Sequence, residues 1–180
     1  MKKVGLEKET EFFVTGVRTY VDADDAMTEF RRMAQHKCWT VASRRLGDIN
    51  KALDMRLTPA DLHDYDQKTD DHHYIGKQAE VKGLGVLYFC LRLSREDKGS
   101  NFDAFVFLYR KRRDIAEGLW DRSRALEAVT WKGRNDLGFG QTLPENKIPK
   151  FDNYLDGAVT DFLAFINESG GLKKHLAPAS

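Results

Sequence analysis

Carboxylates and a lysine near the middle of the chain are spaced so that they could bind a divalent cation. Eight residues separate Asp71 from the run Glu80-Val81-Lys82, and Asp70 stands directly before Asp71. Residues two apart on a strand face the same way, so Glu80 and Lys82 would share one side of a strand. Carboxylates bind hard cations, and a lysine can stabilise charge that develops on a phosphate or a water. This spacing indicates metal-dependent phosphodiester cleavage as one alternative.

The same residues locally resemble the motif of the PD-(D/E)XK restriction-type nucleases, whose core runs helix, three strands, helix, strand. The resemblance implies that Asp70 or Asp71 and Glu80 bind a divalent metal ion, and that Lys82 is the catalytic lysine. Asp71, Glu80 and Lys82 would then be the catalytic set. The other interpretation is a surface charge pair at the mouth of a strand, with no catalytic residue, no metal and no cofactor.

A second group of possible metal ligands surrounds His72-His73. It also contains His63, Asp64, Asp66, Asp70 and Asp71. Imidazole and carboxylate groups bind zinc, iron or manganese when three or four of them converge. Adjacent residues rarely point into one coordination sphere, and no two histidines have the helical i, i+4 spacing. We therefore expect a hydrated acidic loop over residues 61–73 rather than a metal site.

Basic and aromatic residues gather after residue 109. The candidate binding residues are Arg110, Arg112, Arg113, Trp120, Trp131 and Arg134. Arginine pairs bidentately with phosphate, and aromatic rings stack on bases, so such a surface could hold a nucleic acid strand or an acidic protein. A junction of strand and helix that carries solvated arginines is the alternative.

Two apolar runs define the elements that must position these side chains. Residues 86–93 and 102–109 are rich in aromatic and β-branched residues and flank a turn-like segment, so they predict a long β-hairpin. Both arms are apolar on both faces, which is typical of central strands covered by helices. Helices on each side of the sheet, or a partner subunit on one side, would complete the burial, so a homodimer is one possibility.

Periodicity assigns the other segments. Apolar residues recur at three- and four-residue steps between residues 26 and 53 and again between 151 and 166, which predicts a long and a C-terminal helix. We expect a first strand over residues 11–21 and a loop over 133–141. Together these elements predict an α+β fold: a mostly antiparallel sheet of four or five strands, built around the hairpin and packed with the N-terminal and C-terminal helices.

Length, composition and net charge limit the number of domains and the classes of partner that the chain can have. The chain has 180 residues, of which 41% are hydrophobic and 32% charged, and this favours one domain over residues 1–180 with a frayed tail from residue 171. The net charge of +1 gives no long-range field toward nucleic acid or a membrane. No apolar segment has the length of a membrane span, and no signal peptide is recognisable, so a cytoplasmic location is expected. Cys38 and Cys90 have no metal-site spacing and are expected to be buried.

The sequence therefore predicts a non-enzymatic, cytoplasmic binding or accessory protein without a cofactor. Its expected partner is a protein or a nucleic acid, contacted at the basic residues after 109. The alternative is the metal-dependent phosphodiesterase described above.

Overall fold

The computed structural model describes residues 2–96, 99–124, 126 and 129–176. Two compact units make up the chain, one ending at Met33 and one beginning at Ala34. Helix α1 (Lys2–Leu53) supplies the first unit and contributes residues 34–53 to the second. Each unit is described by itself.

The strand expected over residues 11–21 is wrong, because this segment is part of α1. Its β-branched and aromatic content favours a strand, but Phe13, Val17 and Tyr20 follow each other at steps of four and three, which is the period of a helix. Strict alternation of apolar and polar residues is missing. The helical period therefore outweighs the strand propensity here.

The second unit is an α+β structure around one antiparallel sheet, as the sequence predicts, but the sheet has six strands rather than four or five. Their order is β1-β2-β3-β4-β6-β5. After α1 the elements are η1 (Pro59–Asp61), β1 (His63–Lys68), β2 (His72–Val81), β3 (Gly85–Glu96), β4 (Gly99–Arg110), α2 (Glu117–Arg124), β5 (Trp131–Lys132), β6 (Asp136–Leu143), η2 (Glu145–Lys150), α3 (Phe151–Glu168) and α4 (Leu172–Leu176).

The predicted hairpin is confirmed as β3 and β4, which pair antiparallel from Gly85 with Arg110 to Glu96 with Gly99. Residues 97 and 98 of its turn lie outside the described residues. Both strands are central in the sheet, because β2 flanks β3 and β6 flanks β4.

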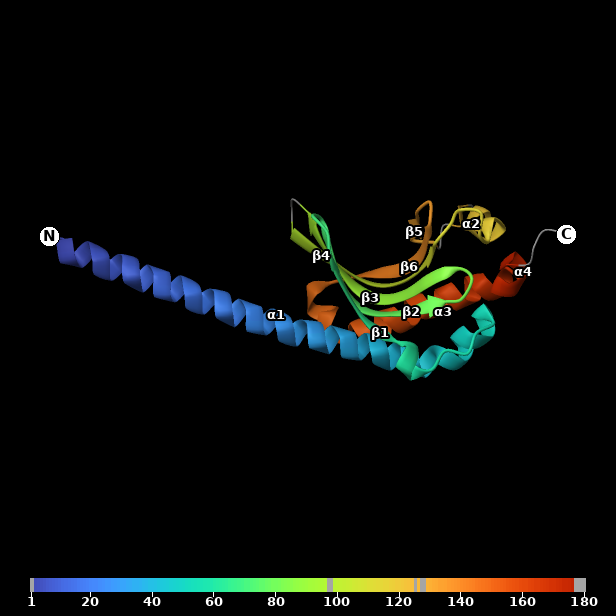
Figure 1. Cartoon of the computed structure of the whole chain (residues 1–180), viewed down its shortest axis with the longest axis horizontal. Coiled ribbons are helices and arrows are strands. Elements are labelled where there is room, and N and C mark those ends of the chain that lie inside the picture. Colours follow the sequence, from blue (N-terminus) through green and yellow to red (C-terminus); the bar gives the residue numbers. More distant parts are fainter. Residues whose placement is uncertain (1, 97–98, 125, 127–128, 177–180) are drawn as a thin grey trace. The chain divides into compact units, whose positions relative to one another are not determined.

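Helix α3 packs against one face of the curved sheet, and the buried residues of α1 between 34 and 53 lie on the same face (Figure 1). The apolar stripe of α3 is fully buried there at Leu155, Val159 and Phe162. The Cys38 thiol of α1 lies against the backbone of Leu91 in β3. Both cysteines are buried, as expected, and burial raises the pKa of each thiol.

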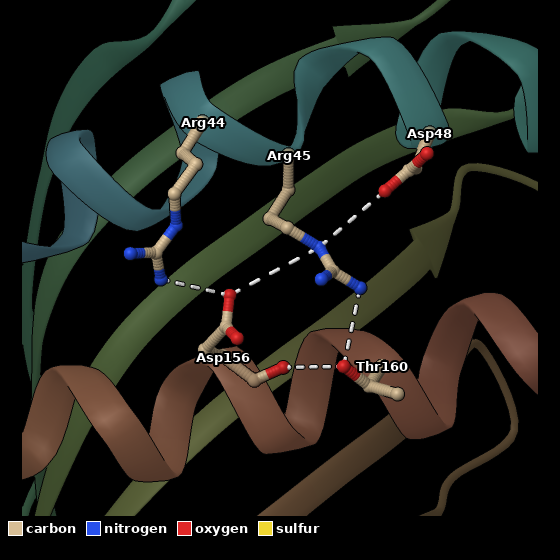
Figure 2. Close-up of polar contacts among 5 residues, drawn as sticks. All are labelled: Arg44, Arg45, Asp48, Asp156 and Thr160. Carbon is tan, nitrogen blue, oxygen red and sulfur yellow. Dashed lines mark hydrogen bonds and ion pairs between the residues drawn. The ribbon is translucent and has the colours of Figure 1, made fainter.

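Polar side chains join the two helices along their exposed edges (Figure 2). The Arg44 guanidinium donates to Asp156 Oδ1 at 3.0 Å, and Arg45 Nη2 donates to Thr160 Oγ1 at 3.1 Å. Arg45 Nε also lies 3.9 Å from Asp156 Oδ1 and 3.7 Å from Asp48 Oδ2. Asp156 is therefore shared by two arginines of the neighbouring helix.

Asp156→Ala is expected to lower the free energy of unfolding by about 0.5–1 kcal/mol, because partly exposed ion pairs contribute little more than this. Urea denaturation measures the change, which should shrink at high salt as the charges are screened. Asp48→Ala is the matched control and should be close to neutral, since within the described residues the ion pair of Asp48 is the longer, 3.7 Å contact with Arg45. Equal losses for the two variants would contradict the shared role of Asp156.

Two segments expected to be loops are strands. Residues 63–68, inside the predicted loop 61–73, form β1, an edge strand whose polar residues are tolerated because one side of it is free. Residues 136–141, inside the predicted loop 133–141, belong to β6. Residues 172–176, expected in a frayed tail, form α4 with Leu172 buried, and residues 177–180 lie outside the described part.

Candidate ligand-binding pocket

The open face of the sheet, opposite α3, carries a row of aromatic side chains. Along β4 the buried residues Ala104, Val106 and Leu108 alternate with Phe105, Phe107 and Tyr109, so the two sets point to opposite faces. The second set helps to form a pocket of about 330 Å³. The pocket is lined by Tyr65, Gln67, Tyr74, Tyr88, Phe105, Phe107, Tyr109, Trp131 and Asp136.

Two glycines of β6 make room for the floor of this pocket. A Cβ atom at Gly140 would lie 2.1 Å from Phe105 Cδ2, and one at Gly138 would lie 2.6 Å from Phe105 Cζ. The Phe105 ring thus lies flat over β6 and is only 2% exposed. Trp131 of β5 packs against it with the ring centroids 5.7 Å apart. These glycines serve close packing within a strand and not a turn.

The rings form one continuous network. Tyr88 and Phe107 stack with centroids 4.3 Å apart and planes 11° from parallel, and Tyr65 packs against Tyr88 at 4.6 Å. Phe107 also contacts Phe105 at 5.6 Å and Tyr74 at 6.3 Å. Tilted and offset arrangements of this kind are favourable between aromatic rings. The pocket wall is therefore held in place by its own packing.

The hydroxyl group of Tyr65 has a hydrogen-bond partner within β1, and three tyrosines of the pocket are neutral. The Tyr65 hydroxyl donates to Gln67 Oε1 at 2.7 Å. Burial is the main cause that raises the pKa of Tyr65, Tyr74 and Tyr88, and the nearby Asp136 adds to it, while Arg92 opposes it at Tyr74. These tyrosines consequently remain uncharged at physiological pH and present neutral rings to the pocket.

Asp136 is the single acidic residue of the lining. It is about half-buried, and burial alone raises the pKa of its carboxyl group, with no basic neighbour in the described part of the chain offsetting the effect. The folded protein therefore holds this proton more tightly than the unfolded chain does. As the pH rises through the raised pKa, ionisation of Asp136 lowers the free energy of unfolding.

Arg92 also lies on the open face, but its charge is matched. Its Nε and Nη2 donate to Asp103 Oδ2 at 3.0 and 2.8 Å, and Asp103 Oδ1 accepts from the Thr142 hydroxyl at 2.7 Å. The guanidinium stacks on Phe105 and Trp131, 5.3 and 5.0 Å from their centroids. The Arg92–Asp103 pair has no net charge. Among the described residues, Asp136 is therefore the residue of the pocket lining whose charge has no opposite charge beside it.

The residues of the phosphodiesterase alternative are not brought together. Asp70 and Asp71 form the turn between β1 and β2, whereas Glu80 lies nine residues from Asp71 along β2, about 30 Å away at ~3.4 Å per residue. The Glu80 carboxylate instead accepts from Lys111 Nζ at 2.8 Å, which lowers the pKa of Glu80. Lys82 is exposed in the following turn. This geometry gives the alternative no support.

The histidines are likewise separated by the pairing of β1 with β2. His73 Nε2 lies 2.6 Å from Asp66 Oδ1 across the two strands, while His72 packs edge-on against Tyr74 at 5.9 Å. Among residues 2–96, 99–124, 126 and 129–176, no three His, Cys, Asp or Glu side chains form a group that could hold a metal ion.

The basic residues after 109 divide into two groups. Arg110 and Trp120 are buried, and the Arg110 guanidinium stacks on the Trp120 ring at 4.5 Å. Arg112, Arg113 and Arg134 are exposed, and Arg112 forms an ion pair with Asp114. Contact with a macromolecule at the exposed arginines stays a prediction, to which Arg110 and Trp120 cannot contribute directly while buried.

Sequence reasoning missed most of the pocket. Trp131 belongs to the predicted binding residues, but as part of a basic surface and not as a pocket wall. The signal that could have found the others is the alternation of β4, which places Phe105, Phe107 and Tyr109 on one face. The contributions of β1 and β6 carry no comparable signal, because both segments have the composition of loops.

Fold and site together define an α+β protein with an aromatic pocket on the open face of an antiparallel sheet. Comparison with protein-family models, with curated proteins and with solved structures finds no significant match for this chain. In the part of the chain that the structure describes, none of the helices combines the length and the apolar character that crossing a bilayer requires.

Proposed function

We propose that this protein binds a small organic molecule in the aromatic pocket. The observation that carries the proposal is a pocket of about 330 Å³ lined by seven aromatic rings from five strands. Ligand sites of proteins range from ~300 to ~1,000 Å³ and combine mostly apolar walls with a few polar groups. Gln67 and Asp136 supply the polar groups here.

The partial exposure and the fixed positions of the aromatic rings support a role in ligand binding. Tyr65, Tyr88 and Phe107 are only partly buried, so a ligand would remove further aromatic surface from water. Their packing against one another fixes their positions before a ligand enters, which reduces the entropy lost on binding. A planar or compact apolar group fits such walls best.

Trp131→Leu is expected to abolish binding of aromatic fragments, because it removes one wall of the pocket. Trp39→Leu is the matched control: Trp39 is 37% exposed on α1 and does not line the pocket. A fragment screen by thermal shift should raise the melting temperature of the wild type and of Trp39→Leu, since a ligand stabilises the state it binds.

Two outcomes would overturn the proposal. One is an equal thermal shift in Trp131→Leu and Trp39→Leu for every active fragment, which would place binding elsewhere. The other is the absence of any fragment that stabilises the wild type at millimolar concentration. The unliganded melting temperatures of the variants show whether both remain folded.

A further inference from the structure

We propose that the pocket selects ligands with a cationic nitrogen, a quaternary or alkylated ammonium group, held between the Asp136 carboxylate and the rings of Tyr88 and Tyr109. This inference rests on the proposed function, because it specifies the chemistry of the ligand in the same pocket. It goes further in assigning a charge to the ligand and a partner to Asp136.

The strand pairing places Asp136 among the rings. Asp136 of β6 is directly opposite Tyr109 of β4, and both line the pocket. Side chains opposite each other on one face of an antiparallel pair have Cβ atoms ~4.5–5.5 Å apart, and diagonal neighbours are ~7–8 Å apart. The diagonal neighbour of Asp136 is Phe107, which stacks on Tyr88. A group bound beside the carboxylate therefore meets these three rings.

The charges around the pocket favour a cation. None of the nine lining residues is basic, and the nearby Arg92 is neutralised by Asp103. Asp103 lies six residues from Tyr109 along β4, about 20 Å, so the carboxylate that pairs with Arg92 is far from Asp136. An anionic ligand would be repelled by Asp136 and would find no free basic group in the lining.

The cost of removing Asp136 from water favours a cationic ligand over a neutral one. A neutral ligand that fills the pocket would take Asp136 further out of water without a partner, which is unfavourable for a carboxylate. A cation would supply the missing partner and would also interact with the electron-rich ring faces. The raised pKa of Asp136 agrees with this picture, because no positive charge of the chain itself compensates for its burial.

Two rings of the pocket lining already contact a cation of the chain itself, the guanidinium of Arg92. Arg92 stacks on Phe105 and Trp131 at 5.3 and 5.0 Å, which occupies those two rings. No side-chain cation is recorded over Tyr88, Phe107 or Tyr109 in the described part of the chain. Among the described residues, these three rings lie next to the unbalanced carboxylate and hold no side-chain cation, and Tyr88 and Phe107 each use one face on the other.

Choline and its neutral carbon isostere 3,3-dimethyl-1-butanol test the inference with the full chain. The two probes have the same shape and differ in charge. Titration of each is followed by NMR on the indole N–H signal of Trp131, assigned by its loss in Trp131→Phe. We expect choline to bind about tenfold or more tightly than the alcohol, because only choline gains the Coulomb attraction of the carboxylate and the cation–π interaction with the rings.

Asp136→Asn should remove most of this preference, with the affinity for choline falling toward that of the alcohol. The variant keeps the shape of the side chain and removes a buried charge, so its unliganded melting temperature should equal or exceed that of the wild type. Asp121→Asn, which changes an exposed carboxylate on α2, is the control and should keep the preference.

The outcomes separate the two levels of the proposal. Equal binding of choline and the alcohol, or an unchanged preference in Asp136→Asn, overturns the cationic ligand but leaves a pocket that binds small molecules. Binding of a neutral aromatic probe such as indole without binding of choline has the same meaning. If neither choline, the alcohol nor indole moves the Trp131 signal at millimolar concentration, the proposed function fails as well.

Discussion

Arg110→Ala is expected to lower the free energy of unfolding by about 2–4 kcal/mol, since it removes a buried, packed side chain and leaves two partly buried backbone hydrogen bonds unmade. Arg110 is 2% exposed. Its Nη1 donates to the carbonyl of Ile115 and its Nη2 to the carbonyl of Arg134, both at 3.0 Å. The same guanidinium lies 4.5 Å from the centre of the Trp120 ring. One side chain thus ties the end of β4 to the segments on either side of α2.

Arg113→Ala is the matched control for this prediction. Arg113 is exposed three residues further along the chain, and a surface substitution of this kind changes stability by no more than ~0.5 kcal/mol. Urea denaturation of the two variants provides the measurement. A loss for Arg110→Ala that is no larger than the loss for Arg113→Ala would show that the buried contacts of Arg110 do not stabilise the fold.

Gly140→Ala is expected to destabilise the protein by about 1–3 kcal/mol, the cost of overpacking a well-packed core. The added Cβ would lie 2.1 Å from Phe105 Cδ2 and 3.0 Å from the carbonyl oxygen of Ala104. The Phe105 ring must therefore move, and with it the floor of the pocket. The same variant should lose ligand binding at temperatures where it remains folded.

Gly47→Ala gives the opposite sign for the same chemical change. Gly47 is an exposed helical residue of α1, and a Cβ there would meet no atom within 4 Å. Replacing glycine inside a helix by alanine is worth roughly 0.5–1 kcal/mol of stabilisation. Thermal denaturation that shows Gly140→Ala as stable as the wild type would refute the packing argument, and Phe105→Leu in the Gly140→Ala background should recover part of the loss.

The long periodic elements could be predicted from the sequence because burial imposes a repeat on them. Residues 34–53 of the helical stripe, the hairpin and the C-terminal helix each bury an apolar face over many residues. The strand expected over residues 11–21 is wrong for a different reason: this segment is exposed, and its β-branched and aromatic residues favour a strand although the steps from Phe13 to Val17 to Tyr20 are helical.

The remaining elements could not be found because their roles depend on neighbours distant in sequence. Gly138 and Gly140 resemble a turn until Phe105 of another strand is placed over them. β1 resembles a loop because an edge strand can be polar, and its Asp66 pairs with His73 only once β2 lies beside it. Tertiary contacts and not local preferences determine these segments.

The basic residues after 109 illustrate an intermediate case. Arg110 continues the alternation of Ala104, Val106 and Leu108, so the period of β4 already assigns it to the buried side. Its charge alone favours a solvent-exposed position instead. Alternation is therefore the better guide to burial within a strand than residue type, provided that the chain can supply partners such as the carbonyl of Ile115.

The two buried thiols have a consequence for the chemistry of the protein in a cell. Cys38 and Cys90 are both inaccessible, and burial raises the pKa of each, so neither presents a thiolate to an oxidant or an electrophile. Alkylating reagents reach Cys38 only when residues 34–53 of α1 move away from β3, and they reach Cys90 only when the aromatic side chains packed over it on the open face, such as Tyr74 and Phe105, move aside. Both thiols are thereby protected from oxidation in the folded state, and the rate at which they are alkylated follows the opening of the interior.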